Sequence, residues 1–207
     1  MRRSLNGGYW QNSGDRLIHV RRTGNLPSMQ KRRTFNDPGH AHELTFSTYR
    51  RTRIFEEDAF CRLFLAKLDA SRKAHAYEVW AYVVMPDHVH LLVWPTLEKY
   101  DVVQFRKSLK GAVAREAVHL LRQRDDAILG RLSLSAAGVP QRTRLWQTGG
   151  GYDRNIHSTA ACQKSIAYIH NNPVVAGLCP HPCDYEWSSA CWYRGDKCDF
   201  QVDRAKN

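Results

Sequence analysis

An apolar stretch at residues 77–95 restricts the fold more than any other part of the chain. It has the sequence YEVWAYVVMPDHVHLLVWP, in which Pro86 and Asp87 separate two runs rich in β-branched and aromatic residues, Tyr77–Met85 and His88–Trp94. Two such runs joined by a short turn are typical of an antiparallel hairpin. We therefore expect this hairpin to form the centre of a β-sheet.

The segments before and after the hairpin have the periods of a further strand and two helices. Residues 40–49 alternate between two sets of side chains, which predicts a strand that ends at Arg50 and Arg51. Residues 56–76 repeat apolar side chains at helical spacing, with acids in the first turn and bases in the last. Residues 100–124 have an apolar stripe at the same spacing, which predicts a long helix.

The chain after these elements is less regular. Its glycines indicate a loop, which is followed by a short strand at 144–147 and a glycine turn at 149–151. A last helix is expected from Ser158, a favourable N-terminal cap, to Asn171, where it stops before Pro173. The resulting order β-α-β-β-α-β-α predicts an α+β, ferredoxin-like sandwich with a central antiparallel sheet and helices on one face.

Charge divides the chain into a basic tail and a domain. Residues 1–35 contain eight Lys or Arg, one acid and no sustained periodicity, so we predict a disordered N-terminal tail. The domain is expected at 36–195, with a C-terminal tail at 196–207. The net charge of +11 favours a polyanionic partner such as nucleic acid. Without a long apolar run or a secretion signal, we expect a cytoplasmic protein with no membrane partner.

His88-Val89-His90, in the second run of the hairpin, is the first candidate site. On a strand, residues i and i+2 point to the same face, so the two imidazoles should project side by side while Val89 faces the core. Two imidazoles on a rigid strand provide half of a metal site. The pattern is short, and two solvent-facing histidines beside a turn would have the same spacing.

Tyr168 and Asn172 form the second candidate site. They are four residues apart on the last predicted helix, so a phenol and a side-chain carbonyl share one face. Both could be directed toward the histidine pair, although Pro173 disfavours helical geometry at Asn172. Alternatively, Tyr168 is an ordinary packing residue and Asn172 an ordinary residue at a helix end.

Together, these motifs resemble a known family. MPDHVHLLVWP, followed by YIHNNPVVAGL and DYEWSSA, is similar to the single-tyrosine HUH transposases, and in particular to the REP-associated tyrosine transposases. The resemblance covers about residues 33–195. It implies a metal-dependent single-strand DNA endonuclease and strand transferase that recognises single-stranded, hairpin-forming DNA.

The resemblance also implies roles for individual residues. His88 and His90 match the HUH pair, and Asn172 matches a third ligand to Mg²⁺ or Mn²⁺. Tyr168 matches the nucleophile that attacks phosphorus and forms a 5′-phosphotyrosine bond. Two imidazoles and an amide oxygen also accept Zn²⁺ or Co²⁺, so the motif leaves the metal open. Members of the family occur as monomers and as dimers with exchanged tyrosine helices, so the sequence leaves monomer or homodimer undecided.

Basic side chains near these motifs are candidate contacts to DNA phosphates. They follow the first strand or lie on the long helix: Arg50, Arg51, Arg53, Lys107, Lys110 and Arg115. Most surface bases interact only with solvent, and basic residues alone provide non-specific affinity. Two other functions therefore stay open: a non-catalytic ferredoxin-like nucleic-acid-binding protein, and a nickase of the relaxase or replication-initiator type.

Overall fold

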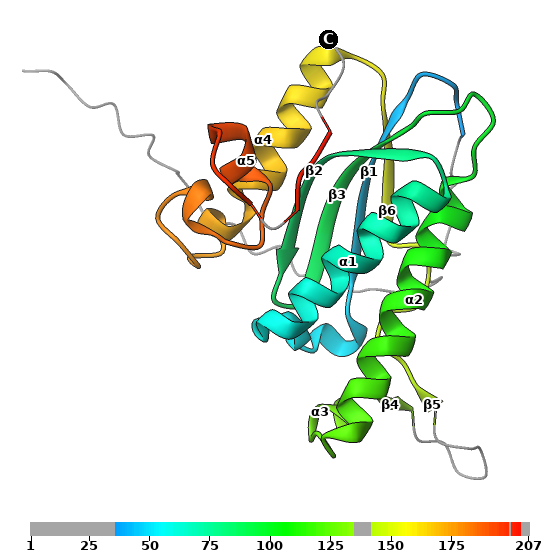
Figure 1. The fold of residues 1–207 in the computed structure, drawn as a ribbon, viewed down its shortest axis with the longest axis vertical. Coiled ribbons are helices and arrows are strands. Elements are labelled where there is room, and N and C mark those ends of the chain that lie inside the picture. The colour runs from blue at the N-terminus through cyan, green and yellow to red at the C-terminus, as the bar shows by residue number, and fades with distance from the viewer. Residues whose placement is uncertain (1–35, 135–141, 199, 204–207) are drawn as a thin grey trace, which may run out of the picture. The chain divides into compact units, whose positions relative to one another are not determined.

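A computed structural model describes residues 36–134, 142–198 and 200–203, so the predicted tail at 1–35 lies outside the described residues. The fold is built on a four-stranded sheet in the order β2-β3-β1-β6, and all neighbouring strands are antiparallel (Figure 1). The strands are β1 (Ala41–Ser47), β2 (Tyr77–Met85), β3 (His88–Pro95) and β6 (Tyr152–Ile156). The predicted hairpin is confirmed, but it does not form the centre of the sheet: β3 and β1 are the interior strands, and β2 lies at an edge.

Two helices cover one face of this sheet. They are α1 (Asp58–Ala74) and α2 (Val102–Gln123), which lie side by side in Figure 1. Both follow the predicted periodicity, and the side chain of Asp101 caps α2 by accepting a hydrogen bond from the Gln104 amide. The main apolar core lies between these helices and the sheet, and includes Phe46, Phe64, Val89, Phe105 and Leu109. The α+β fold with a central antiparallel sheet is therefore confirmed.

A third long helix, α4 (Thr159–Val175), packs on the opposite face of the sheet, where the sequence had placed no helix. Its Cys162 and Ile169 join a smaller apolar cluster with Trp80 and Val83 of β2 and Leu92 of β3. Hydrophobic periodicity marks the buried side of a helix without identifying the sheet face that it covers. The sheet is consequently covered on both faces, by α1 and α2 on one and by α4 on the other.

The fourth strand differs from the prediction. Residues 144–147 form only an isolated bridge between Trp146 and Thr48, and the Trp146 ring packs in the main core against Phe46. The chain then passes through Gly151, which has a φ of +76° and would bring a Cβ atom within 2.1 Å of the Thr45 carbonyl oxygen. Only glycine permits this close approach. Immediately afterwards, β6 pairs with β1.

The C-terminal end of α4 also differs from the prediction. The Ser158 side chain caps the helix as expected, accepting a hydrogen bond from the Ala161 amide at 3.3 Å. The helix nevertheless continues through Pro173 to Val175. Pro173 is buried, and the amides of Ala176 and Leu178 close the helix end by donating to the carbonyls of Asn172 and Pro173. Asn172 therefore remains helical.

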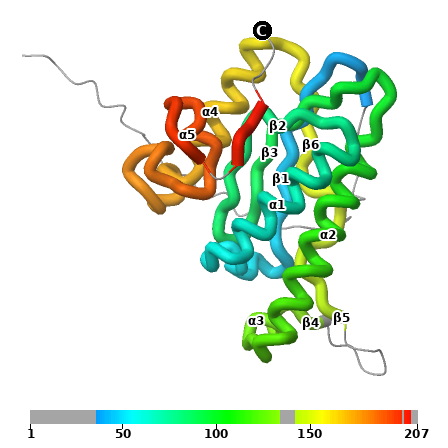
Figure 2. Tube along the Cα trace, in the orientation of Figure 1, coloured from blue at the N-terminus to red at the C-terminus, as the bar shows by residue number. Residues whose placement is uncertain are grey.

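The chain after α4 returns to β2, as Figure 2 shows. Two backbone hydrogen bonds hold this aromatic segment on the sheet: the Val84 amide donates to the Trp187 carbonyl, and the Ser189 amide donates to the Tyr82 carbonyl. Phe200 is buried in the main core, so part of the expected C-terminal tail packs with the domain. None of the described helices is long and apolar enough to cross a membrane.

The remaining described elements are short. They are η1 (Tyr49–Arg51), η2 (Ile54–Glu56), α3 (Ile128–Leu132), β4 (Ser133–Leu134), β5 (Arg142–Thr143), η3 (Pro182–Asp184) and α5 (Ala190–Arg194). Among them, η1 contains two successive residues with left-handed backbone angles, Arg50 at φ +54° and Arg51 at φ +53°. Such angles are uncommon for residues with a Cβ atom, and here they end β1 beside the hairpin turn.

Candidate functional site

The two histidines of β3 lie side by side on the face of the sheet that α4 covers. Their ring centroids are 5.0 Å apart, and Val89 between them is buried in the core on the opposite face. His90 is buried, whereas His88 at the start of the strand is half-buried. The alternation of a β-strand therefore places the pair as the sequence predicted.

Each imidazole is held through its Nδ1 atom. His88 Nδ1 lies 2.6 Å from Asp87 Oδ1, and His90 Nδ1 lies 2.9 Å from Thr45 Oγ1. A partner on Nδ1 fixes the orientation of the ring and leaves Nε2 as the nitrogen that could bind a ligand. Burial, together with the neighbouring His88, lowers the pKa of His90 to about 4. Its imidazole is therefore neutral at physiological pH, as metal ligation requires.

Tyr168 projects from α4 beside this pair. Its ring centroid lies 5.6 Å from that of His90, with the two planes perpendicular. The side chain is 54% exposed although it belongs to a helix packed on the sheet. The structure thus brings His88, His90 and Tyr168 together within one chain.

Asn172 shares the α4 face of Tyr168 but does not reach the histidines. Its Nδ2 donates a hydrogen bond to the Tyr168 carbonyl at 2.8 Å, and no hydrogen bond joins it to either imidazole in the described part of the chain. It lines a cavity of about 780 Å³ between α4 and the C-terminal segment, together with Cys183 and Tyr193. In the same described residues, no three His, Cys, Asp or Glu side chains gather as a metal site. The histidine pair fits half of a divalent-metal site, and the Asn172 role stays a prediction.

A second cavity, of about 570 Å³, lies in front of Tyr168. Seven residues line it: Glu43, Thr45, His90, Tyr152, Arg154, Lys164 and Tyr168. Five of these were not predicted as site residues: Glu43, Thr45, Tyr152, Arg154 and Lys164. Tyr152 and Arg154 belong to β6, which was missed as a strand because its sequence YDRNI has no alternation of apolar and polar residues that could have located it.

Glu43 is the polar centre of this cavity. It is buried in the middle of β1, and its Oε2 accepts hydrogen bonds from Arg154 Nη2 and from Ser165 Oγ, each at 2.6 Å. Because Arg154 lies directly across from Glu43 on β6, the pair is a cross-strand ion pair. Ser165 comes from α4, so one carboxylate connects β1, β6 and the helix that positions Tyr168.

The bases predicted to contact DNA fall into two groups. Arg50, Arg51 and Arg53 are exposed at the end of the sheet that carries His88, and Arg51 Nη1 lies 3.4 Å from Asp87 Oδ2. Lys107, Lys110 and Arg115 belong to α2, on the opposite face from Tyr168. Within the first group, Arg51 is connected to the histidine pair through Asp87, whereas Arg50 packs over Tyr49 and Arg53 pairs with Glu56.

Lys110 is not an open surface base. Its Nζ lies 5.6 Å from the Phe46 ring centroid and 5.9 Å from that of Trp146, and donates to the Gly149 carbonyl at 3.3 Å. Burial, with the nearby Arg106, lowers the pKa of Lys110 to about 8. Aromatic packing of the ammonium explains its position in the fold.

The first half of the domain matches a known protein family. Residues 39–133, which include both histidines and end before Tyr168, match the model of the family "Transposase IS200 like". No curated protein matches the chain. The family match therefore covers the strands β1, β2 and β3 and the helices α1 and α2, and does not extend to the helix that carries Tyr168.

Solved structures extend the likeness to most of the chain. A REP-associated tyrosine transposase bound to a REP hairpin is 17% identical, covers 86% of this chain and 95% of its own, and superposes with a TM-score of 0.62. A crystal structure of a transposase candidate from Deinococcus radiodurans R1 is 23% identical, with 69% of this chain and 97% of that chain covered and a TM-score of 0.43. The chain has the fold of a REP-associated tyrosine transposase, and the resemblance inferred from its motifs is confirmed.

Proposed function

We propose that this transposase is a single-strand DNA endonuclease and strand transferase in which Tyr168 is the nucleophile. The observation that supports this most directly is the position of the Tyr168 ring, whose centroid is 5.6 Å from that of His90, where both side chains line one open cavity. The structural relative is bound to a REP hairpin, which supports hairpin DNA as the partner. A binding protein without catalytic activity would not need an exposed phenol beside two oriented imidazoles.

The proposed reaction is a transesterification at phosphorus. The Tyr168 hydroxyl oxygen forms a bond to the scissile phosphorus, and the bond from phosphorus to the 3′ oxygen of the neighbouring nucleotide breaks. The phenol gives up its proton, and the leaving 3′ oxygen takes one up to become a hydroxyl. The product is a 5′-phosphotyrosine ester, which an incoming 3′-hydroxyl reverses to join a new strand, so no ATP is needed.

The residues around Tyr168 supply orientation and charge. A phenol in water has a pKa of about 10 and is a weak nucleophile at neutral pH. A divalent ion such as Mg²⁺ or Mn²⁺ on His88 and His90, with Asn172 as the predicted third ligand, would polarise the phosphate and stabilise developing negative charge. Asp87 and Thr45 hold the two imidazoles so that both Nε2 atoms remain available. Glu43 and Ser165 hold α4, and with it Tyr168, over β3.

Covalent capture of DNA tests this proposal. The protein is incubated with Mn²⁺ and an end-labelled hairpin oligonucleotide taken from beside its own gene, and the products are separated under denaturing conditions. We expect a protein–DNA adduct with the wild type and none with Tyr168→Phe. The matched control is Tyr77→Phe, which removes a buried hydroxyl that has no hydrogen-bond partner and should leave the adduct unchanged.

Two results would overturn the proposal. An adduct of equal amount with Tyr168→Phe would exclude this tyrosine as the nucleophile. A shift of the hairpin on a native gel without any adduct, in Mn²⁺ and in Mg²⁺, would favour the non-catalytic nucleic-acid-binding protein.

A further inference from the structure

We propose that Arg154 and Lys164 form a phosphate-binding subsite beside Tyr168, which holds a backbone phosphate of the single-stranded DNA. This inference rests on the proposed function, because it assigns residues that position the substrate of that reaction. Neither residue belongs to the histidine motif or the tyrosine motif. Both line the same cavity as His90 and Tyr168.

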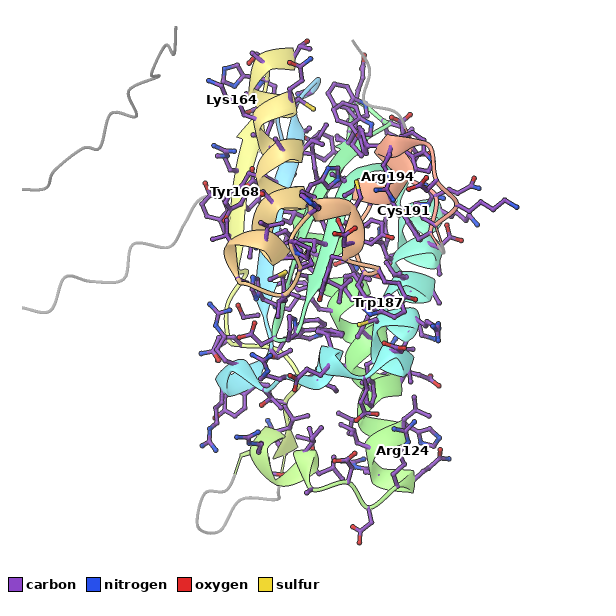
Figure 3. The ribbon with its side chains drawn as sticks, turned by 90° about the vertical axis from the view of Figure 1, so that its left-hand side faces the viewer. Arg124, Lys164, Tyr168, Trp187, Cys191 and Arg194 are labelled. Carbon is purple, nitrogen blue, oxygen red and sulfur yellow. A yellow bond between two sulfur atoms is a disulfide. The ribbon has the colours of Figure 1, made fainter. Side chains whose placement is uncertain are left out.

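Two elements deliver the positive charges to this cavity. Lys164 lies four residues before Tyr168 on α4, so the two side chains share one face of the helix. Figure 3 labels both on the same side of α4. Arg154 comes from β6, beside Tyr152 and across β1 from the histidine strand. A phosphate entering the cavity would therefore meet one cation from α4 and one from β6.

Arg154 is oriented in advance. Glu43, which is only 4% exposed, accepts a hydrogen bond from Arg154 Nη2 at 2.6 Å. A guanidinium carries five N–H donors in a rigid plane, so one bond to Glu43 fixes its orientation and leaves the fork able to bind a phosphate as well. The Arg154 side chain is 48% exposed, so a ligand can reach it. Preorganisation of this kind reduces the entropy lost on binding.

The charge of the cavity suits a phosphodiester. Arg154 and Lys164 contribute two positive charges and Glu43 one negative charge, which leaves an excess of one to balance one phosphate. The adjacent acid of β6, Asp153, points to the opposite face, where it contacts His42 and Arg106. If the Arg154–Glu43 pair served only to stabilise the fold, its removal would not change the affinity for DNA.

Binding measurements can test the subsite separately from cleavage. All variants are made in the Tyr168→Phe protein, and the affinity for a labelled hairpin with a single-stranded flank is measured by fluorescence anisotropy at several salt concentrations. The first variant is Lys164→Gln, an exposed position where folding is not at risk. The second is Glu43→Gln with Arg154→Gln, which removes both charges together so that no buried carboxylate is left unpaired. The control, Lys67→Gln with Lys73→Gln, removes two charges on α1.

We expect each subsite variant to bind about tenfold more weakly, because each loses one charge-assisted contact to phosphate. The slope of log affinity against log salt should become shallower by about 0.7 for each contact removed. The α1 control should keep the affinity and slope of the Tyr168→Phe protein in which all variants are made. If the subsite variants match the control, the inference is wrong, and Lys164→Gln decides this alone if the Glu43 and Arg154 variant does not fold.

A series of oligonucleotides, each with one uncharged methylphosphonate linkage, locates the phosphate. With Tyr168→Phe protein, one linkage in the flank should weaken binding about tenfold, and the subsite variants should be insensitive to it. Equal sensitivity in the variants would contradict the subsite. The outcome does not depend on covalent chemistry, so a protein that binds through Arg154 and Lys164 but forms no adduct would overturn the proposed function and not this inference.

Discussion

The two faces of the sheet come from the same strands but carry different kinds of side chain. On the α1 and α2 face, β1 contributes Leu44 and Phe46 to a core in which Phe46, Phe64 and Trp146 pack with ring centroids 5.1–6.5 Å apart. On the α4 face, the same strand contributes Glu43 and Thr45, which hydrogen bond to Arg154 and His90. Because side chains alternate along β1, one face of the sheet receives apolar core residues and the other receives the polar residues of the site.

The difference indicates how the molecule accommodates a polar site. The α4 face contains a smaller apolar cluster around Trp80, Leu92 and Ile169, and it also holds the hydrogen bonds and the ion pair of Glu43. Hydrogen bonds contribute less net free energy than the burial of large apolar side chains. We therefore expect the α1 and α2 face to determine the free energy of unfolding, and the α4 face to tolerate isosteric changes at exposed functional groups.

The largest effect is expected from a cavity in the α1 and α2 face. Phe64→Ala removes a fully buried ring that packs against Phe46, Phe55 and Trp146, and should lower the free energy of unfolding by about 3–5 kcal/mol. Tyr168→Phe, on the other face, removes only an exposed hydroxyl and should change it by less than about 0.5 kcal/mol. Urea unfolding followed by circular dichroism measures both. Equal losses in the two variants would refute the division of roles between the faces.

A smaller, pH-dependent effect is expected on the α4 face. His170 of α4 is buried with Nε2 at 2.8 Å from Ser189 Oγ and its ring 5.1 Å from that of Tyr193, and burial lowers its pKa to about 4. In the unfolded chain this imidazole takes up a proton near pH 6.5. The contribution of His170 to the free energy of unfolding is therefore complete above that pH. It should fall by about 2–3 kcal/mol as the pH decreases from 6.5 to 4.

A variant isolates this histidine from His90, whose pKa is also lowered by burial. His170→Gln cannot be protonated, so its free energy of unfolding should depend less steeply on pH between 6.5 and 4 than that of the wild type. Urea titrations at four pH values across this interval provide the comparison. Parallel pH profiles for the two proteins would show that His170 does not contribute.

The smallest difference, about 1 kcal/mol, is expected between two glycines of the turn that leads into β6. Gly151→Ala would place a Cβ atom 2.1 Å from the Thr45 carbonyl oxygen at a left-handed φ, and should cost about 2 kcal/mol or more. Gly149→Ala has a similar φ of +91° with no atom within 4 Å, and should cost only about 1 kcal/mol. Thermal unfolding of the two variants tests the difference. Equal costs would mean that β6 does not need the close approach to β1.

Much of this arrangement could be predicted from local sequence. The hairpin, α1 and α2 have strong periodicity, and the direction of the two imidazoles follows from the two-residue period of β3. The relation between Tyr168 and Asn172 likewise follows from helical spacing. These features require only neighbours in the chain.

Other features depend on contacts between distant residues. The strand β6 has the polar sequence YDRNI, which has little β-propensity of its own, and it forms because β1 offers an unpaired edge. The position of α4 on the second face depends on its packing against β2 and β3. Glu43 and Arg154 are separated by 111 positions, so their ion pair could not be predicted without knowing that β1 and β6 are neighbours in the sheet.

The shared carboxylate of Glu43 also restricts how the sequence can change in evolution. A side chain that accepts hydrogen bonds from both Arg154 and Ser165 ties three positions into one unit. Replacing Glu43 with a neutral residue would remove the hydrogen-bond acceptor of both the Arg154 guanidinium and the Ser165 hydroxyl. Replacing Arg154 or Ser165 alone would leave the buried carboxylate of Glu43 partly unsatisfied. Positions 43, 154 and 165 should therefore drift together among homologous chains, in concerted steps, even where the surrounding surface diverges freely.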